Sequence, residues 1–240
     1  MHHPKANAIL SQLPEEQYRF LHPHMKLVSL KKGEILLETG RPVEHYFFPV
    51  SCAVELVVDL EDGNAGSATV INMNGMYPLH LIGESLSHQR AAVCSTGLCY
   101  RIPAWVIHQQ IRRDQSLLWL LLKEAVKIFQ LVSIESVCLR HHTLGQVTAK
   151  LILLSLDNSA TSVVAFTQQE MANSLGVRRE GVTMTLQKFK TQKFITTHRG
   201  GLTVIDRTGL EGNACACYKT LSELRKMPAS GKPMEWTTND

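Results

Sequence analysis

The sequence predicts an α+β chain in which an N-terminal antiparallel β-roll is followed by a long helix and a C-terminal winged helix-turn-helix. Three observations lead to this prediction. Short runs rich in β-branched and aromatic residues crowd into residues 25–101. A long segment with an apolar stripe follows at residues 115–141. Residues 167–202 then combine a helix cap, a turn glycine and an alternating hairpin.

Residues 1–113 are expected to form the β-roll domain. Two short amphipathic helices are predicted within residues 7–23, and seven strand-like runs follow, separated by turn segments such as KKGE and EDGNAGS. Because no long helix separates these runs, they favour a compact antiparallel roll or barrel. The runs are LVSL, EILL, YFFPV, AVELVVDL, ATVINM, RAAVC and LCYRI.

A long helix is predicted at residues 114–142, after a shorter helix that Pro103 opens. Asp114 is placed to cap the long helix. Its apolar stripe is too broad for one neighbouring element, so we expect one face on the β-roll and another against a second copy of the chain, as a short coiled coil. Burial within a monomer is the alternative. The residues expected at the dimer interface are Leu118, Leu121, Leu122, Ala125, Ile128, Phe129 and Val132.

Residues 143–221 are expected to form a second domain, with residues 222–240 as a polar tail. The segment around His141 and His142 predicts a hinge before a helix at about 146–156. Thr167 and Glu170 then form a capping box, and Gly176 provides the turn between two helices. The second helix, beginning near Arg178, has apolar residues at i, i+4 and i+7, and the segments KFITT, HRGG and LTVI complete a hairpin.

Charge is concentrated in the same segment. Residues 167–203 hold six basic and two acidic residues, whereas residues 1–166 hold 14 of each and residues 204–240 hold five of each. The formal net charge of +4 therefore lies on this segment, as the neutralisation of DNA phosphates requires. A solvated helical hairpin is the alternative, but the coincidence of charge with cap, turn and wing favours DNA binding.

The order of elements and the pattern T-x-x-E-x-A-x-x-x-G-x-x-R-E-x-V resemble the Crp/Fnr family of bacterial transcription regulators. The turn KKGEILLETGRP also resembles the first glycine-bearing turn of that family's cyclic-nucleotide-binding-like domain, at Gly33, Glu34 and Gly40. The resemblance implies a cytoplasmic homodimer that binds a palindromic operator in double-stranded DNA, with RNA polymerase as a further partner. The matching positions are Thr167, Glu170, Ala172, Gly176, Arg179, Glu180, Val182 and Leu186.

The second helix of this motif is expected to read DNA, because its N-terminal end enters the major groove in helix-turn-helix proteins. An arginine there can bond to guanine and a glutamate can accept from cytosine. Many relatives carry arginine where this chain has Met184, so we expect an apolar contact at that position. The predicted base-reading residues are Arg179, Glu180, Thr183 and Met184. The predicted phosphate contacts are Gln168, Gln169, Arg178, Thr183, Lys188, His198 and Arg199.

The effector cannot be read from the sequence. Nucleotide-binding relatives carry Gly-Glu and, about ten residues later, Arg-Ser or Arg-Thr. Anchoring on Gly75 and Arg90 places Leu79 and His80 where Gly-Glu belongs, and Ala91 follows the arginine. We therefore expect a regulator that cyclic nucleotides do not control. The alternative is a cyclic-nucleotide-responsive regulator that uses Glu84 and Arg90, with a shortened loop between them.

Other chemistries find little support in the sequence. Residues 1–51 contain no cysteine for an iron–sulfur cluster, and no histidine lies in a recognisable haem motif. Most of the six cysteines are expected to be small core residues, with Cys215 and Cys217 on different faces of one helix, so no metal site is predicted. No catalytic motif, secretory signal or membrane span is visible. A nucleotide-controlled regulatory subunit and an enzyme are the competing hypotheses.

Overall fold

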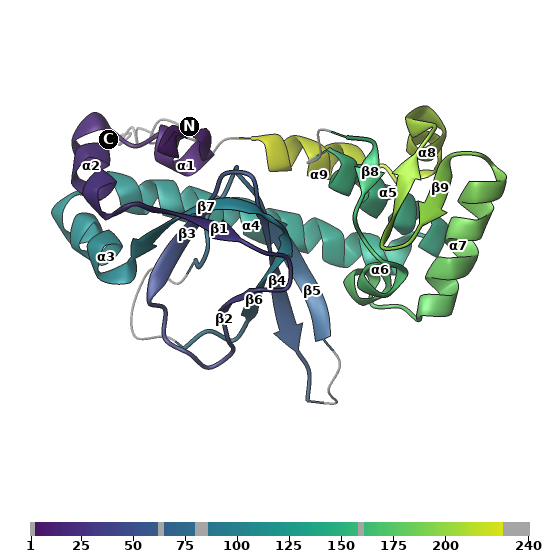
Figure 1. Ribbon diagram of the computed structural model, residues 1–240, viewed down its shortest axis with the longest axis horizontal. Coiled ribbons are helices and arrows are strands. Elements are labelled where there is room, and N and C mark those ends of the chain that lie inside the picture. Colours follow the sequence, from purple (N-terminus) through teal and green to yellow (C-terminus); the bar gives the residue numbers. More distant parts are fainter. Residues whose placement is uncertain (1–2, 62–64, 80–85, 158–160, 228–240) are drawn as a thin grey trace, which may run out of the picture.

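The computed structural model describes residues 3–61, 65–79, 86–157 and 161–227, and Figure 1 shows two lobes lying along one long helix, α4. The first lobe holds the helices α1 (Ala8–Ser11), α2 (Glu15–Leu21) and α3 (Ala104–Arg113), with short 3-10 turns at Pro4–Ala6 and His22–His24. Its strands are β1 (Lys26–Leu30), β2 (Ile35–Leu37), β3 (His45–Pro49), β4 (Ala53–Asp59), β5 (Ala65–Ile71), β6 (Arg90–Ser95) and β7 (Gly97–Pro103).

These strands form two antiparallel sheets, one in the order β1-β7-β3 and the other in the order β2-β6-β4-β5. All seven strand-like runs predicted from the sequence are therefore confirmed as strands. Alternation along β3 separates two cores, because successive side chains of a strand point to opposite faces. Phe47 packs inside the roll with Val54 and Leu56, whereas Tyr46 and Phe48 pack against the N-terminal helices.

Helix α4 (Ser116–His141) begins beside Asp114, whose Oδ1 accepts a hydrogen bond of 2.8 Å from the backbone N–H of Ser116. One face of the helix completes the cores of the β-roll: Leu121 is fully buried and Ile128 is 8% exposed. These two predicted dimer contacts are thus used within the chain, and Val132 also packs partly against the roll. The opposite face exposes Leu122 and Phe129, together with Trp119, Val126 and Val137, which the prediction omitted.

The second lobe contains α5 (Leu144–Leu156), β8 (Val163–Val164), α6 (Gln168–Leu175), α7 (Arg179–Thr191), β9 (Ile195–His198), β10 (Gly201–Val204), α8 (Arg207–Asn213) and α9 (Cys217–Lys226). The strands form one antiparallel sheet in the order β8-β10-β9. Helix α5 starts earlier than predicted, because Thr143 and Gln146 form a capping box. Leu153, Met171, Val182, Leu186 and Leu202 lie at the centre of this lobe, in one core cluster.

Two C-terminal predictions need correction. Cys215 and Cys217 do not share a helix: Ala214 is extended, Cys215 lies in the link between α8 and α9, and Cys217 is the first residue of α9. Residues 222–226 belong to α9 rather than to a polar tail. Leu221 of this helix packs with Leu131 of α4 and Leu154 of α5.

The two lobes are joined by polar contacts as well. Lys32, in the turn between β1 and β2, places its Nζ 2.7 Å from Glu170 Oε1 and donates to the carbonyl oxygen of Ala165 at 3.2 Å. Arg225 of α9 pairs with Glu135 of α4 at 3.1 Å. The turn of the β-roll thus contacts the beginning of the helix-turn-helix. In the part of the chain that the structure describes, none of the helices has the length and apolar character needed to cross a membrane.

Candidate nucleic-acid interface

The capping box fixes the start of the first helix of the motif. Glu170 N–H donates to Thr167 Oγ1 at 3.2 Å, and Thr167 N–H donates to Glu170 Oε2 at 2.7 Å. At the other end, Gly176 ends α6 with a φ of 63°, a left-handed conformation that glycine adopts without steric cost. This turn allows α7 to cross α6, which supports the predicted helix-turn-helix.

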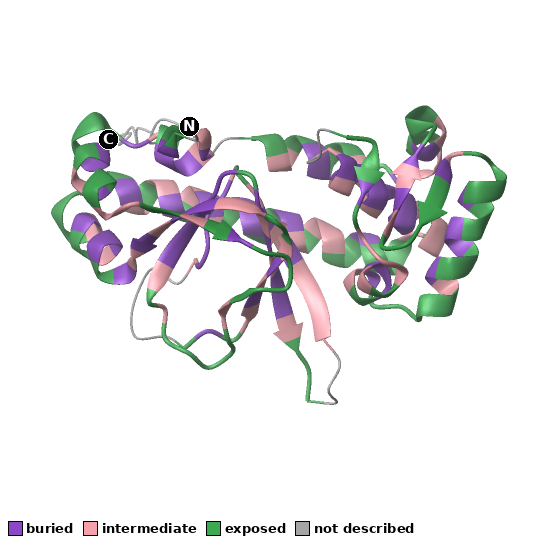
Figure 2. Ribbon diagram, in the orientation of Figure 1, coloured by how far each residue is buried: buried purple, intermediate pink, exposed green. Residues whose placement is uncertain are grey.

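Helix α7 is divided sharply between a buried and an exposed face. Val182, Leu186 and Phe189 are at most 4% exposed, as the spacing in the sequence predicts. The other face is exposed along most of its length, and Figure 2 shows it in green at the edge of the second lobe. The four predicted base-reading residues all lie on this exposed side, at the N-terminal end of the helix: Arg179, Glu180, Thr183 and Met184. Met184 is 66% exposed, which leaves its thioether free for an apolar contact.

A hydrogen bond ties the two helices together within this face. The Thr183 hydroxyl donates to Gln168 Oε1 at 2.7 Å and also lies 3.0 Å from the carbonyl oxygen of Arg179. The structure therefore brings Gln168, at the beginning of α6, next to the first two turns of α7. A second hydrogen bond, from Gln169 Nε2 to Asn173 Oδ1 at 2.9 Å, holds the neighbouring amide along α6.

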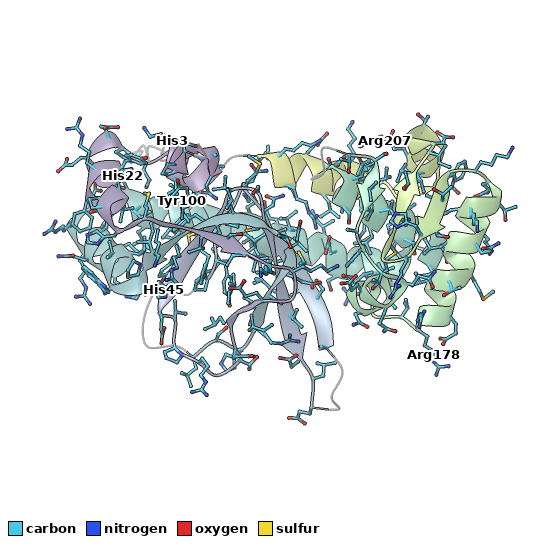
Figure 3. All side chains as sticks on the ribbon, viewed as in Figure 1. His3, His22, His45, Tyr100, Arg178 and Arg207 are labelled. Atoms are coloured by element: carbon cyan, nitrogen blue, oxygen red, sulfur yellow. The ribbon has the colours of Figure 1, made fainter. Side chains whose placement is uncertain are left out.

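The remaining predicted phosphate contacts surround this face. Arg178 precedes α7 and extends outward from the tip of the second lobe in Figure 3. Lys188 is exposed in the later part of α7, and His198 and Arg199 are exposed at the tip of the β9–β10 hairpin. Gly200, with a φ of 87°, closes that hairpin. The basic residues thus lie at both ends of α7 and on the wing.

Sequence reasoning missed one residue of the exposed face. Gln187 lies one turn beyond Thr183 on α7 and is exposed. Gln187 follows Thr183 at i+4, and this spacing could have placed both side chains on one face of α7. Lys190 and Lys193, which contribute to the charge of this segment, are also exposed.

The carboxylate of Glu170 in the capping box is already paired with Lys32. Burial opposes ionisation of Glu170, but hydrogen bonds from Lys32 and from Thr167 outweigh it and lower the pKa of this carboxyl. Glu170 therefore remains charged at neutral pH while paired with Lys32. The positive charge of Lys32, in the β-roll, compensates the negative charge of Glu170. The electrostatic repulsion between Glu170 and an approaching phosphate is therefore reduced.

The β-roll contains a cavity of about 460 Å³. Its polar lining includes Glu38, Arg41, Glu44 and His45, beside the aromatic rings of Phe47 and Tyr77. Burial, reinforced by the charge of Arg101, lowers the pKa of His45, so this imidazole is neutral at pH 7. Of the residues discussed as a nucleotide site, His80 and Glu84 lie outside the described residues.

Arg90 is engaged elsewhere. Its Nε and Nη2 donate to the two carboxylate oxygens of Asp59 at 3.2 and 2.9 Å, across the pair of strands β4 and β6. Hydrogen bonding by Arg90 in turn lowers the pKa of Asp59. A cyclic phosphate would have to displace this bidentate carboxylate before it could use the guanidinium group.

Comparison with known proteins finds a family model that matches most of the second lobe. Residues 146–212 match the family model of the Crp-like helix-turn-helix domain. A comparison with curated protein sequences finds no match.

Solved structures match over most of the chain. A protein from Eubacterium rectale assigned to the Crp/Fnr family of transcriptional regulators has a TM-score of 0.71 at 17% identity, covering 90% of this chain and 97% of that one. FixK2 from Bradyrhizobium japonicum has a TM-score of 0.67 at 16% identity, covering 80% and 98%. A Crp/Fnr-family regulator from Thermus thermophilus has a TM-score of 0.65 at 21% identity, covering 82% and 98%. These similarities show a shared fold.

Proposed function

The chain has the fold of the Crp/Fnr regulators and carries a Crp-like helix-turn-helix domain, and from this premise we propose that it is a homodimeric, sequence-specific DNA-binding transcription regulator. The single observation that carries the proposal is the exposed face of α7. This face presents hydrogen-bonding side chains at its N-terminal end and has basic residues on either side. In a helix that is only solvated, the polar groups have no reason to gather beside other basic elements. Here the polar face of α7 lies beside the basic β9–β10 wing and the capped start of α6.

In this proposal α7 enters the major groove. Arg179 bonds to guanine, Glu180 accepts from a cytosine amino group, and Met184 contacts an apolar edge such as a thymine methyl group. Thr183, held by Gln168, lies between these residues and the DNA backbone. The phosphates are contacted by Gln168, Gln169, Arg178, Lys188, His198 and Arg199.

The dimer is proposed to form along the exposed face of α4. The side chains of Trp119, Val126 and Phe129 are 54%, 57% and 74% exposed. Apolar residues of this size, repeated at helical spacing, are typical of a helix that packs against a second copy. Leu122 and Val137 extend the same face, whereas Leu121 and Ile128 are taken up by the β-roll. A two-fold dimer fits a palindromic operator, and the family resemblance implies RNA polymerase as a partner.

Cyclic nucleotides are proposed not to control the protein. Arg90 is neutralised by Asp59, and the β-roll cavity includes two glutamates against one arginine in its polar lining, which disfavours a bound phosphate. The alternative, a nucleotide-responsive regulator that uses Glu84 and Arg90, requires Arg90 to leave Asp59. Neither the family model nor the similar structures point to an enzyme.

Selection from a random DNA library tests the proposed function. The purified full chain should enrich a palindromic motif with two half-sites about one helical turn apart, or a multiple of this distance. A scrambled version of the enriched sequence is the matched control and should bind about 10³-fold or more weakly at physiological salt. Enrichment of no motif, or equal affinity for the scrambled duplex, would contradict the proposal.

A further inference from the structure

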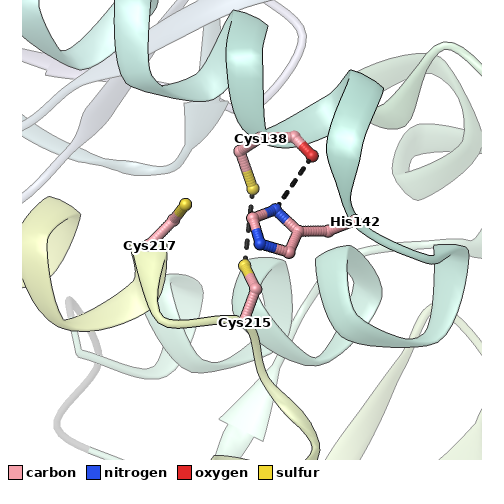
Figure 4. Close-up of side chains that lie close together, drawn as sticks. All are labelled: Cys138, His142, Cys215 and Cys217. Atoms are coloured by element: carbon pink, nitrogen blue, oxygen red, sulfur yellow. Dashed lines mark hydrogen bonds between the residues drawn. The ribbon is translucent and has the colours of Figure 1, made fainter.

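Three cysteines and one histidine from distant parts of the sequence converge where the two lobes meet. Cys138 and His142 are one turn apart at the C-terminal end of α4, while Cys215 lies in the α8–α9 link and Cys217 begins α9. One donor atom from each of the four residues lies within 4.8 Å of the others, and Figure 4 shows the side chains facing a common centre. Among the described residues, this is the group with metal-ligand spacing.

We propose that Cys138, His142, Cys215 and Cys217 form a binding site for a thiophilic divalent metal ion, specifically zinc. Zinc in structural sites takes four sulfur or nitrogen ligands in a tetrahedron, with Zn–S bonds of about 2.3 Å. Two sulfur ligands at tetrahedral angles then lie about 3.8 Å apart. The Sγ atoms of Cys138 and Cys215 are 3.4 Å apart, so only small shifts are needed to admit the ion. The same separation is too long for a disulfide, whose sulfur atoms are about 2.05 Å apart.

The ring of His142 is oriented by a hydrogen bond from one of its nitrogens, as is usual for histidines that bind metal ions. Its Nδ1 lies 3.2 Å from the carbonyl oxygen of Cys138, and donation of the Nδ1 proton to this oxygen leaves the Nε2 lone pair for the metal. In Figure 4 the second ring nitrogen is on the side of the ring that faces the sulfur atoms of Cys138 and Cys215. The i, i+4 spacing on one helix thus brings a nitrogen and a sulfur ligand to the same face.

A buried cation completes the site. Lys150 of α5 is 3% exposed, and its Nζ lies 3.5 Å from Cys138 Sγ. A buried ammonium group needs a compensating negative charge. Zinc with three thiolates and a neutral imidazole carries one net negative charge, which Lys150 offsets. Each thiol loses its proton to the solvent as its bond to zinc forms, and binding therefore releases protons.

Ordinary core packing does not account for this group. Cys138 and Cys215 are buried with the core of the second lobe, but His142 and Cys217 are only half-buried. The β-roll offers a comparison, since Cys52 and Cys99 also form a thiol pair there, without two further ligands. The ion would join the end of α4 to the α8–α9 link, and so fasten the DNA-binding lobe to the long helix.

Metal content and cobalt spectroscopy test this proposal on the full chain, purified under reducing conditions without chelators. We expect one zinc per chain by elemental analysis. After replacement by cobalt, we expect a thiolate-to-cobalt charge-transfer band and the visible bands of a tetrahedral ion. In competition with a chromophoric chelator, Cys217→Ser and His142→Ala should each weaken zinc affinity by about 100-fold or more, since even loss of an outer-shell partner costs 10–100-fold. Cys94→Ser, a substitution in β6, is the matched control and should leave the affinity unchanged.

Absence of zinc from the reduced wild-type chain, together with a cobalt spectrum that lacks the thiolate band, would overturn the proposal. Equal zinc affinity in wild type, Cys217→Ser and His142→Ala would also overturn it. Circular dichroism of each variant shows whether it is folded. If a variant fails to fold, alkylation of the wild-type thiols provides the test instead. Zinc should protect three cysteines of the wild type from alkylation. Alkylation that is the same with and without zinc would refute the site.

Discussion

At the scale of residues, we expect individual side chains on α7 to determine which DNA sequence the protein prefers. Arg179 lies at the first position of the helix and is exposed. Arg179→Ala should cost about 1–3 kcal/mol on the preferred operator and relax preference at one base pair of each half-site. Selection from a random library measures this directly. Arg19→Ala, at an exposed arginine on α2, is the control. An unchanged motif in the Arg179 variant would remove Arg179 from the base-reading set.

Lys188 and Arg199 should act on affinity without changing specificity. Each is exposed, one on α7 and one on the wing, and a phosphate contact releases about one counterion. Replacing either residue by alanine should weaken binding to all duplexes and reduce the slope of log K against log salt by about one unit. Lys219→Ala on α9 serves as the control. If both variants keep the wild-type slope, these side chains face solvent in the complex.

Asp157 is a residue whose ionisation should stabilise the second lobe. Burial opposes its charge, but hydrogen bonds from Arg207 at 2.6 Å and Ser222 at 2.7 Å outweigh it and lower its pKa. Because the folded-state pKa is below the unfolded value, the stabilisation is present above about pH 4 and is lost as the pH falls through the folded-state pKa.

Urea unfolding of Asp157→Asn measures this contribution. At pH 7 the variant should be about 1–2 kcal/mol less stable than the wild type, a figure that allows for the partial exposure of Arg207. The gap should close in acid. Glu211→Gln removes the other, exposed carboxylate partner of Arg207 and should cost less. A gap that is the same at pH 7 and pH 3 would contradict the role of the charge.

At the scale of elements, α4 carries the proposed contact between copies of the chain. Phe129→Asp puts a charge on a side chain that is 74% exposed and should therefore leave the monomer folded. We expect sedimentation to show monomers, with operator affinity at least about tenfold lower because two half-sites no longer bind together. Leu60→Asp, on a side chain 54% exposed beyond β4, should stay dimeric. A dimeric Phe129 variant would place the interface elsewhere.

Elements were predictable from the sequence where the signal is local. The β-roll strands follow from short runs rich in β-branched and aromatic residues between turn segments, and α6 and α7 follow from a cap, a turn glycine and a helical period. The orientation of α4 is different. Leu121 is buried and Leu122 is 37% exposed, yet both are leucines in one broad stripe, and only the position of the β-roll decides between them.

The link between α8 and α9 shows a second limit. Gly212 and Asn213, residue types that often end helices, mark the end of α8, and this signal was available in the sequence. What the sequence could not give is the approach of Cys215 to Cys138, 77 residues earlier. That contact depends on the packing of α9 against α4. Clusters formed by tertiary packing are not visible in a linear spacing rule.

For the whole molecule, the expected behaviour is operator binding without a cyclic nucleotide. Isothermal titration with cyclic AMP and cyclic GMP should give affinities at least about 100-fold weaker than micromolar, because the paired contacts that would hold the ligand cost 1–3 kcal/mol each when lost. Arg90→Ala should titrate like the wild type. Micromolar binding that strengthens operator affinity and disappears in Arg90→Ala would establish the nucleotide-responsive alternative.

The carboxylate of Glu170 makes two contacts at once. One oxygen accepts a hydrogen bond from the backbone N–H of Thr167, and the other is paired with Lys32. The start of the first helix of the motif and the β1–β2 turn of the β-roll therefore share a single group. Displacing that turn removes the counter-charge from Glu170, and fraying that helix removes the anchor from Lys32. Such coupling is reciprocal by thermodynamic necessity. DNA that stabilises the start of α6 should therefore also strengthen the ion pair between Glu170 and Lys32.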